Sequence, residues 1–233
     1  DGIRLWHVGD GRLLRQFGIK QADNVAFSPD GRLLASFSRG EVELWRVEDG
    51  RLLRRLGKRL KAYSTSSIAF SPDGSLLATG GIKDAQLWSV RNGILVRELK
   101  ETLPMWDRLI GGTFPYLNCV AFSPDGSLLA VSASDGVQLW SVSNGTQLNK
   151  LEKSGFEHGV TFSPNGSLLV TVNNLGVKLW SAKDGALLRY LEYEKSPDRD
   201  RIGTTQFGSV AFSPDGRLLA SGANDGVRVW AVS

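Results

Sequence analysis

The sequence has very few of the residues that build disulfides, metal centres and histidine-dependent active sites. Its 233 residues include one cysteine, one methionine and two histidines. A disulfide within the chain is impossible, and a cysteine-based metal cluster is excluded. Neither His7 nor His158 has a second His or Cys at ligand spacing, so we expect no metal and no cofactor. The single Cys119 favours a reducing compartment, and we expect a cytoplasmic protein.

Long apolar runs are missing too. No stretch of eighteen apolar residues occurs, so the sequence predicts no membrane-spanning segment. The chain opens with Asp1-Gly2-Ile3-Arg4, which is neither a secretory signal nor an initiator methionine, and we expect an excerpt from a longer protein. Hydrophobic residues make up 41% of the chain and charged residues 22%, a composition typical of soluble globular proteins.

What the sequence does contain is a repeat. A phrase of the form apolar-Ala-Phe-Ser-Pro-Asp-Gly occurs five times with small variations, and the phrase apolar-x-apolar-Trp occurs six times. The spacing from each Phe to the following Trp is always 18 residues, which indicates copies of one structural unit. The anchoring residues are Phe27, Phe70, Phe122, Phe162 and Phe212, and Trp6, Trp45, Trp88, Trp140, Trp180 and Trp230.

Each copy predicts four short strands. In one copy, residues 25–27 form a short apolar strand and residues 28–31 (Ser-Pro-Asp-Gly) form a reverse turn. Residues 33–36 are almost continuously apolar, as expected of a strand buried on both faces, whereas residues 41–45 alternate like a half-buried strand. After a second turn signal, residues 51–56 form a fourth, more exposed strand.

This pattern resembles the WD40-repeat family, in the version with Ala-Phe-Ser-Pro-Asp-Gly turns that is common in bacteria. The resemblance covers nearly the whole chain and implies an all-β propeller of four-stranded antiparallel blades. Two family features are missing: the Asp after each Trp, and the Gly-His pair about nine residues before each Phe. The resemblance therefore implies that the family's buried Asp–His–Ser/Thr–Trp network is mostly absent. We expect the blades to depend more on apolar packing than on that network.

We interpret the chain as a single domain of five blade equivalents plus one strand, with 21 strands in total. Residues 1–24 would form a partial blade with a third and a fourth strand, and residues 210–233 a partial blade with the first three strands. The ring either closes with five blades, the N-terminal fourth strand completing the last one, or is part of a six- or seven-bladed ring, which we favour. The full repeats span residues 25–67, 68–118, 119–158 and 159–209.

Length variation is confined to the connections between each Trp and the next Phe, and two of these connections are long. Function in repeat proteins generally lies in such variable loops, which in this family lie near the central channel. The first long loop is rich in residue types that dominate protein interfaces, although it could instead fold over the propeller. The second is either a charged recognition loop or a solvated one. The predicted partner-binding residues are Met105, Trp106, Arg108, Phe114 and Tyr116 in the first loop, and Arg199 and Arg201 in the second.

Residues 51–61 carry six positive charges and no acidic residue. We favour an exposed outer strand that is kept soluble by its charge. The second interpretation is a basic patch that contacts nucleic acid, anionic lipid or an acidic protein. Nucleic acid is the weaker partner because no aromatic residue is interleaved with the charges. The patch would comprise Arg54, Arg55, Lys58, Arg59 and Lys61.

Catalysis finds no support in the sequence. No Gly-x-Ser-x-Gly nucleophile motif occurs, and Gly111-Gly112 lacks the Lys-Ser/Thr of a phosphate-binding loop. Glu101 and Asp107 are the only candidates for a glycosidase carboxylate pair, and nothing places them face to face. We predict a non-catalytic scaffold or sensor module of a larger multidomain protein, with protein partners. The alternatives are a propeller-class hydrolase and a nucleic-acid or anionic-surface binding module; the oligomeric state stays undetermined.

Overall fold

The described part of the chain is built from β-strands. The computed structural model describes residues 2–18, 22–38, 41–56, 67–80, 84–100, 119–133, 136–151, 157–173, 176–192, 207–223 and 226–232. These residues form 21 strands in six antiparallel sheets, as the repeat pattern predicts. They contain no helix that is long and apolar enough to cross a membrane.

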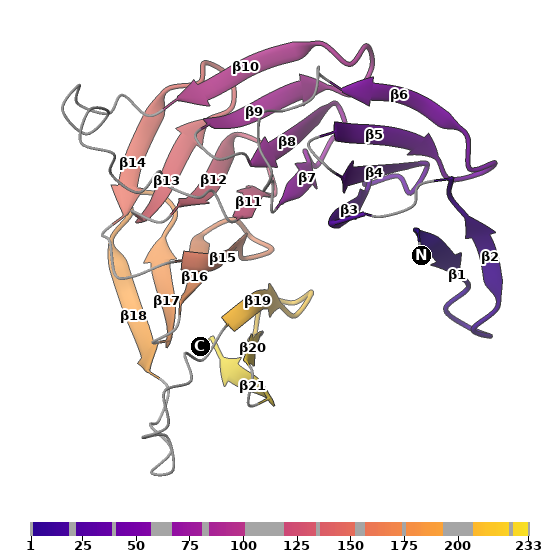
Figure 1. Cartoon of the computed structure of the whole chain (residues 1–233). Helices are drawn as coiled ribbons and strands as arrows, with labels where there is room; N and C mark the ends of the chain where they lie inside the picture. Colours follow the sequence, from indigo (N-terminus) through magenta and orange to yellow (C-terminus); the bar gives the residue numbers. More distant parts are fainter. Residues whose placement is uncertain are drawn as a thin grey trace, which may run out of the picture.

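The six sheets follow one another along an arc, and each is a propeller blade or part of one (Figure 1). Blade 1 has two strands and blade 6 has three, whereas blades 2 to 5 have four each. The first strand of a full blade lies on the inner side of the arc and the fourth on the outer side (Figure 1). The predicted fold class is therefore confirmed. The strands are β1 (Arg4–Trp6) and β2 (Leu13–Gln16) in blade 1; β3 (Asn24–Phe27), β4 (Leu33–Ser38), β5 (Glu41–Arg46) and β6 (Leu52–Leu56) in blade 2; β7 (Ile68–Phe70), β8 (Leu76–Gly80), β9 (Asp84–Ser89) and β10 (Leu95–Lys100) in blade 3; β11 (Cys119–Phe122), β12 (Leu128–Ala133), β13 (Gly136–Ser141) and β14 (Gln147–Leu151) in blade 4; β15 (Glu157–Phe162), β16 (Leu168–Asn173), β17 (Gly176–Ser181) and β18 (Leu187–Glu192) in blade 5; and β19 (Phe207–Phe212), β20 (Leu218–Ala223) and β21 (Gly226–Ala231) in blade 6.

The turn between the first and second strands explains the Ser-Pro-Asp-Gly phrase. In blade 2 the Asp30 carboxylate accepts hydrogen bonds from the Ser28 hydroxyl at 2.6 Å and from the Arg32 backbone N–H at 3.0 Å. Gly31 has a φ of 69°, in the left-handed region that favours glycine. Blade 5 makes the same turn with Asn165 in place of the Asp. The turn is closed by its own side chains, so the phrase is structural.

The repeated tryptophans retain part of the polar network, which the missing Asp and His residues had implied to be mostly absent. In four blades the indole Nε1–H donates to a Ser or Thr hydroxyl on the second strand, at 2.9–3.1 Å. Blade 4 has Val131 at the hydroxyl position, and Trp140 donates instead to Gln138 Oε1 at 3.2 Å. The Ser/Thr–Trp half of the network is therefore present, and the expectation was wrong in that respect. The four pairs are Trp45–Ser36, Trp88–Thr79, Trp180–Thr171 and Trp230–Ser221.

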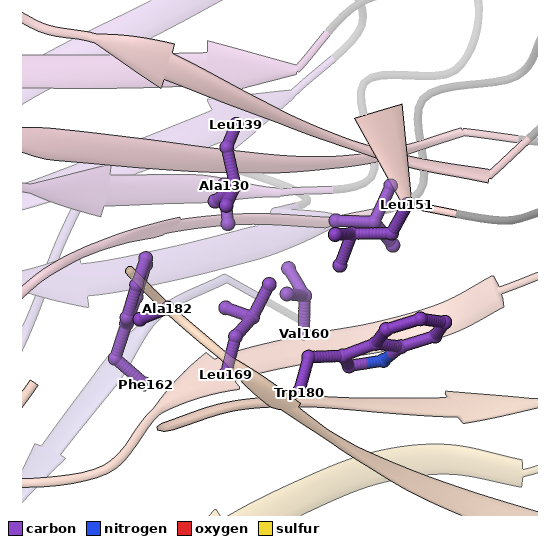
Figure 2. Packing of buried hydrophobic residues seen from close by; sticks show 9 residues of the cluster. Ala130, Leu139, Leu151, Val160, Phe162, Leu169, Trp180 and Ala182 are labelled. Atoms are coloured by element: carbon purple, nitrogen blue, oxygen red, sulfur yellow. The ribbon is translucent and has the colours of Figure 1, made fainter. Parts of the chain in front are cut away.

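Apolar packing between neighbouring blades forms the core. Leu139 and Leu151 of blade 4 face Phe162, Leu169 and Trp180 of blade 5, and all five side chains are buried (Figure 2). Leu169 pairs with Phe162 on one side and with Trp180 on the other in the strand register. The Phe and the Trp of a repeat thus lie at one interface, which accounts for their constant spacing. Equivalent clusters join all consecutive blades.

The N-terminal fourth strand does not complete blade 6 in this structure. β2 pairs with β1, and the described neighbour of β21 is β20. The β1–β2 pair packs on blade 2 through Leu5 and Phe17, which contact Leu34 and Trp45. Blade 1 therefore takes its own place in the arc, at the end opposite blade 6 (Figure 1).

Candidate interaction surfaces

The antiparallel blades place their connections at two ends. One end carries the Ser-Pro-Asp-Gly turns and the Asp-Gly or Asn-Gly turns between third and fourth strands, and we call it the turn end. The other, the connection end, joins second to third strands and each blade to the next, because successive strands alternate in direction. Segments 101–118 and 193–206 leave the fourth strands β10 and β18 at the connection end and return to β11 and β19.

The seven predicted partner-binding residues fall within these two segments. The segments lie outside the described residues, although the strands on both sides of each are described. The structure therefore fixes the end of the blades at which each segment starts and stops. The prediction itself stays a prediction for Met105, Trp106, Arg108, Phe114, Tyr116, Arg199 and Arg201.

The Asp carboxylates of the turn end are already used within the turns. The Ser71 hydroxyl donates to Asp73 at 2.6 Å, and this hydrogen bond is the main reason that the pKa of Asp73 is lowered. A depression between the turns of blades 5 and 6 is lined by Asn165 and Asp215, among others. Both of these side chains accept hydrogen bonds inside their own turns. We therefore assign no ligand to this depression.

Arginines on the outer strands connect consecutive blades at the turn end. Arg15 on β2 donates to the backbone carbonyl of Glu48 in blade 2. Arg97 on β10 donates to the carbonyl of Asn144 in blade 4, at 3.2 Å. The stem of Arg54 on β6 lies against the equivalent turn of blade 3. These side chains hold one blade to the next, and we call them the blade clamps.

The repeat pattern by itself does not predict the blade clamps. Arg15 and Glu48 lie 33 positions apart in the chain, and Arg97 and Asn144 lie 47 positions apart, so only the folded arc brings each pair together. A signal is nevertheless present, because each of the three arginines follows the Gly of a turn by four positions: Gly11 and Arg15, Gly50 and Arg54, Gly93 and Arg97.

The structure describes two of the five residues predicted as a basic patch. Arg55 donates to Glu43 at 2.9 Å and approaches Glu41 at 4.0 Å, and the Glu43 hydrogen bond is the main reason that the pKa of Arg55 is raised. Arg54 is a blade clamp. The observed contacts thus use both arginines within the propeller. The other predicted residues, Lys58, Arg59 and Lys61, lie outside the described residues.

Neither of the two candidate carboxylates is described, since Glu101 and Asp107 fall in the first long segment. Within the described ranges, no group of three or more His, Cys, Asp or Glu side chains is arranged to hold a metal ion. His7 Nδ1 lies 2.8 Å from Asp10 Oδ1 in an exposed turn, where Asp10 also accepts a hydrogen bond from the Arg12 N–H. His7 therefore has a local partner in that turn.

Three segments of the chain match the family model described as WD domain, G-beta repeat: residues 55–88, 108–141 and 203–231. The chain contains WD40 repeats. The first match begins on β6 and ends at Trp88, and the other two end one residue after a third-strand Trp. Each match thus covers the first three strands of one blade, and the first match also includes the end of the preceding outer strand. A search among curated proteins found no match.

Proposed function

We propose that this WD40 chain is a non-catalytic scaffold that binds other proteins. WD40 repeats generally serve as protein-interaction scaffolds, and this chain has three matched repeats. The observation that supports the proposal most is that the repeated polar side chains and the variable connections lie in different parts of the blades. The Ser, Asp and Trp side chains of the repeat are used in turns and between strands, whereas length variation collects at the connection end.

We place the partner-binding surface on segments 101–118 and 193–206. The first contains Trp106, Arg108 and Tyr116, residue types that are enriched among interface hot spots. The second contains Arg199 and Arg201, which suit a carboxylate or phosphate group on a partner. Both segments start and stop at the same end of the blades, so one partner can contact both. We further propose that the chain serves this role within a larger multidomain protein.

Affinity capture with the wild type and the Trp106→Ala/Arg108→Ala variant tests this proposal. Partners retained by the wild type are expected to be lost or weakened at least tenfold in the variant, because hot-spot truncations cost about 2 kcal/mol or more. The matched control is the Arg12→Ala/Leu188→Ala variant, which also removes one Arg and one apolar side chain. Arg12 is exposed just before β2, and Leu188 is exposed on β18. Capture of the same partners by both variants would show that the surface lies elsewhere.

A further inference from the structure

The outer strands share an irregularity at the same position. In each of blades 1 to 5 the strand register skips one residue of the fourth strand, next to the residue that pairs with the third-strand Trp. Such a β-bulge twists the edge of a sheet and disrupts strand pairing along it. We call the skipped residues the bulge residues, and they are Leu14, Leu53, Val96, Leu148 and Leu188.

Every bulge residue is apolar and exposed, with exposed fractions of 43–58%. In blades 3 to 5, all of the exposed large apolar side chains among the described residues lie at the start of an outer strand or just before it. Each of these three blades stands between two described neighbours, so this exposure does not depend on where the chain begins or ends. Exposed apolar groups gathered in this way mark an interaction site. They are Ile94, Leu95, Val96, Leu148, Leu187 and Leu188.

Contacts between blades join these groups along the outer side of the arc. Val96 is followed by the blade clamp Arg97, which donates to the turn that precedes Leu148. Leu148 is followed by Asn149, whose side chain lies against the turn that precedes Leu188. The bulge residues of blades 3 to 5 therefore belong to one surface that follows β10, β14 and β18 (Figure 1). We call it the outer band.

The outer band is basic. From the start of each turn to the residue after the bulge, which is residues 91–97, 143–149 and 183–189, there are four basic residues and one acidic residue. The acidic residue, Asp184, accepts a hydrogen bond from the Ala186 N–H within its own turn. The other Asp turns of these blades join first to second strands, toward the inner side of the arc (Figure 1). A ligand of the band thus meets apolar side chains and positive charge together. The basic residues are Arg91, Arg97, Lys183 and Arg189.

We propose that the outer band binds an extended acidic segment of a partner protein, with apolar residues between its carboxylates. The positive charge of the band selects an acidic ligand. The band follows the convex side of the arc through three blades, so a chain that bends with it contacts each bulge, whereas a flat bilayer does not (Figure 1). Segments that become ordered on binding wrap surfaces of this kind. Because the bulges disrupt pairing along the sheet edges, the segment is recognised through side chains rather than as an added strand.

The outer band is separate from the partner surface proposed above. Segments 101–118 and 193–206 leave β10 and β18 at the connection end, whereas the bulges follow the turns of the turn end. The Trp106→Ala/Arg108→Ala variant is therefore expected to bind a ligand of the outer band like the wild type. A protein held by the two segments is likewise expected to be insensitive to the loss of the Leu188 side chain. The two proposals thus hold or fail independently.

Fluorescence anisotropy with a labelled synthetic peptide of Leu-Glu-Glu-Gly repeats tests the proposal. The wild type is expected to bind the peptide, and more weakly as the salt concentration rises. Leu148→Ser/Leu188→Ser is expected to bind about tenfold more weakly. Arg91→Gln/Lys183→Gln is expected to bind more weakly and with a smaller dependence on salt. The matched control is Val25→Ser/Leu218→Ser, which removes two apolar side chains of similar exposure outside the band and should bind like the wild type.

Two further peptides separate the apolar and the charged parts of the recognition. Peptides of Ser-Glu-Glu-Gly and of Leu-Lys-Lys-Gly repeats are each expected to bind much more weakly than the first peptide. Circular dichroism checks that every variant is folded. A wild type that does not bind the Leu-Glu-Glu-Gly peptide, or that binds it no better than the two band variants do, would overturn the proposal.

Two other occupants of the outer band are tested in parallel. Vesicles of phosphatidylcholine and phosphatidylglycerol that bind the wild type, while the peptide does not, would identify a membrane as the ligand and overturn the proposal. Sedimentation velocity measures self-association in the same way. Self-association that is lost in Leu148→Ser/Leu188→Ser, without peptide binding by the wild type, would assign the band to a second copy of the chain instead.

Discussion

Replacing Thr171 with Val removes the hydrogen-bond acceptor of the Trp180 indole while nearly preserving side-chain volume. Trp180 Nε1 lies 3.1 Å from Thr171 Oγ1, and the two residues are 3% and 1% exposed. A buried donor left without a partner costs about 1–3 kcal/mol, and the added methyl group recovers part of this. We expect the free energy of unfolding to fall by about 1–2 kcal/mol.

Thr79→Val provides the matched comparison in blade 3. Thr79 is also 1% exposed and accepts from Trp88 Nε1 at the same 3.1 Å. The two sites differ in the residue paired across the strand, which is Gln86 in blade 3 and Lys178 in blade 5. In blade 4 a Gln at this position accepts the indole hydrogen bond. We therefore expect Thr79→Val to cost less than half as much as Thr171→Val.

Lys178→Gln extends the test, because it gives blade 5 the arrangement that blade 4 already has. Lys178 Nζ lies 5.5 Å from the Trp180 ring centroid and 5.4 Å from that of Tyr190, so the single variant loses a cation–π contact worth about 0.5–1 kcal/mol. In the Thr171→Val background the new amide is expected to accept the indole hydrogen bond. A double-mutant cycle should show favourable coupling of about 1 kcal/mol.

Urea denaturation followed by circular dichroism measures these differences, and hydrogen exchange of β16 and β17 locates them in blade 5. The slope of the unfolding free energy against urea concentration should be unchanged, since the substitutions do not alter the surface exposed on unfolding. Equal losses for Thr79→Val and Thr171→Val, or zero coupling with Lys178→Gln, would refute the role assigned to Gln as a replacement acceptor. No loss for Thr171→Val would refute the role assigned to the indole hydrogen bond.

Two further predictions concern the turns. Gly185 and Gly31 have φ of 74° and 69°, so replacing either with alanine costs about 1 kcal/mol of backbone strain. An added Cβ at Gly185 would also lie 2.9 Å from Leu151 Cδ2 in the preceding blade, whereas an added Cβ at Gly31 meets no atom within 4 Å. Thermal unfolding should therefore show a larger loss for Gly185→Ala, and equal losses would contradict the close packing between blades. Hydrogen bonds from Ser71 and Ser123 lower the pKa of Asp73 and Asp125 in the folded protein. The two ionised carboxylates therefore stabilise the fold fully above the unfolded pKa of about 4, and this stabilisation is lost as pH falls through the lower folded pKa values. The Asp73→Asn/Asp125→Asn variant, whose turns copy the one at Asn165, should lose less stability than the wild type between about pH 5 and pH 2 in thermal melts, and identical pH profiles would show that these carboxylates do not matter.

Local patterns in the sequence determined the blade. The 18-residue spacing from Phe to Trp indicates copies of one structural unit, and the structure shows why it is constant, since Phe162 and Trp180 lie on either side of Leu169. The Ser-Pro-Asp-Gly phrase predicts a reverse turn, and the turn forms because its hydrogen bonds lie within a few residues. Counting these units predicts two strands in the first partial blade, sixteen in the four full blades and three in the last partial blade, as the structure has them.

The indole acceptors show where a local signal was present but was interpreted through the wrong residues. The absent Asp and His of the family network implied that its polar contacts were mostly lost. Four tryptophans nevertheless have a Ser or Thr nine positions earlier in the chain, and strand pairing turns that separation into a hydrogen bond, as between Ser36 and Trp45. The exception at Val131 is rescued by Gln138, which no spacing rule indicates.

Only the tertiary structure decided how the blades relate to one another. The contact of Arg97 with the turn at Asn144 joins different blades, and its partner is a backbone carbonyl, which carries no sequence signature. The exposure of Trp6 and Val229 is equally invisible in the sequence, because their strands read like those whose equivalent side chains are buried. Whether such a side chain is buried or exposed depends on which blade stands next to it in the arc, and that is a property of the assembled sheets rather than of the repeat.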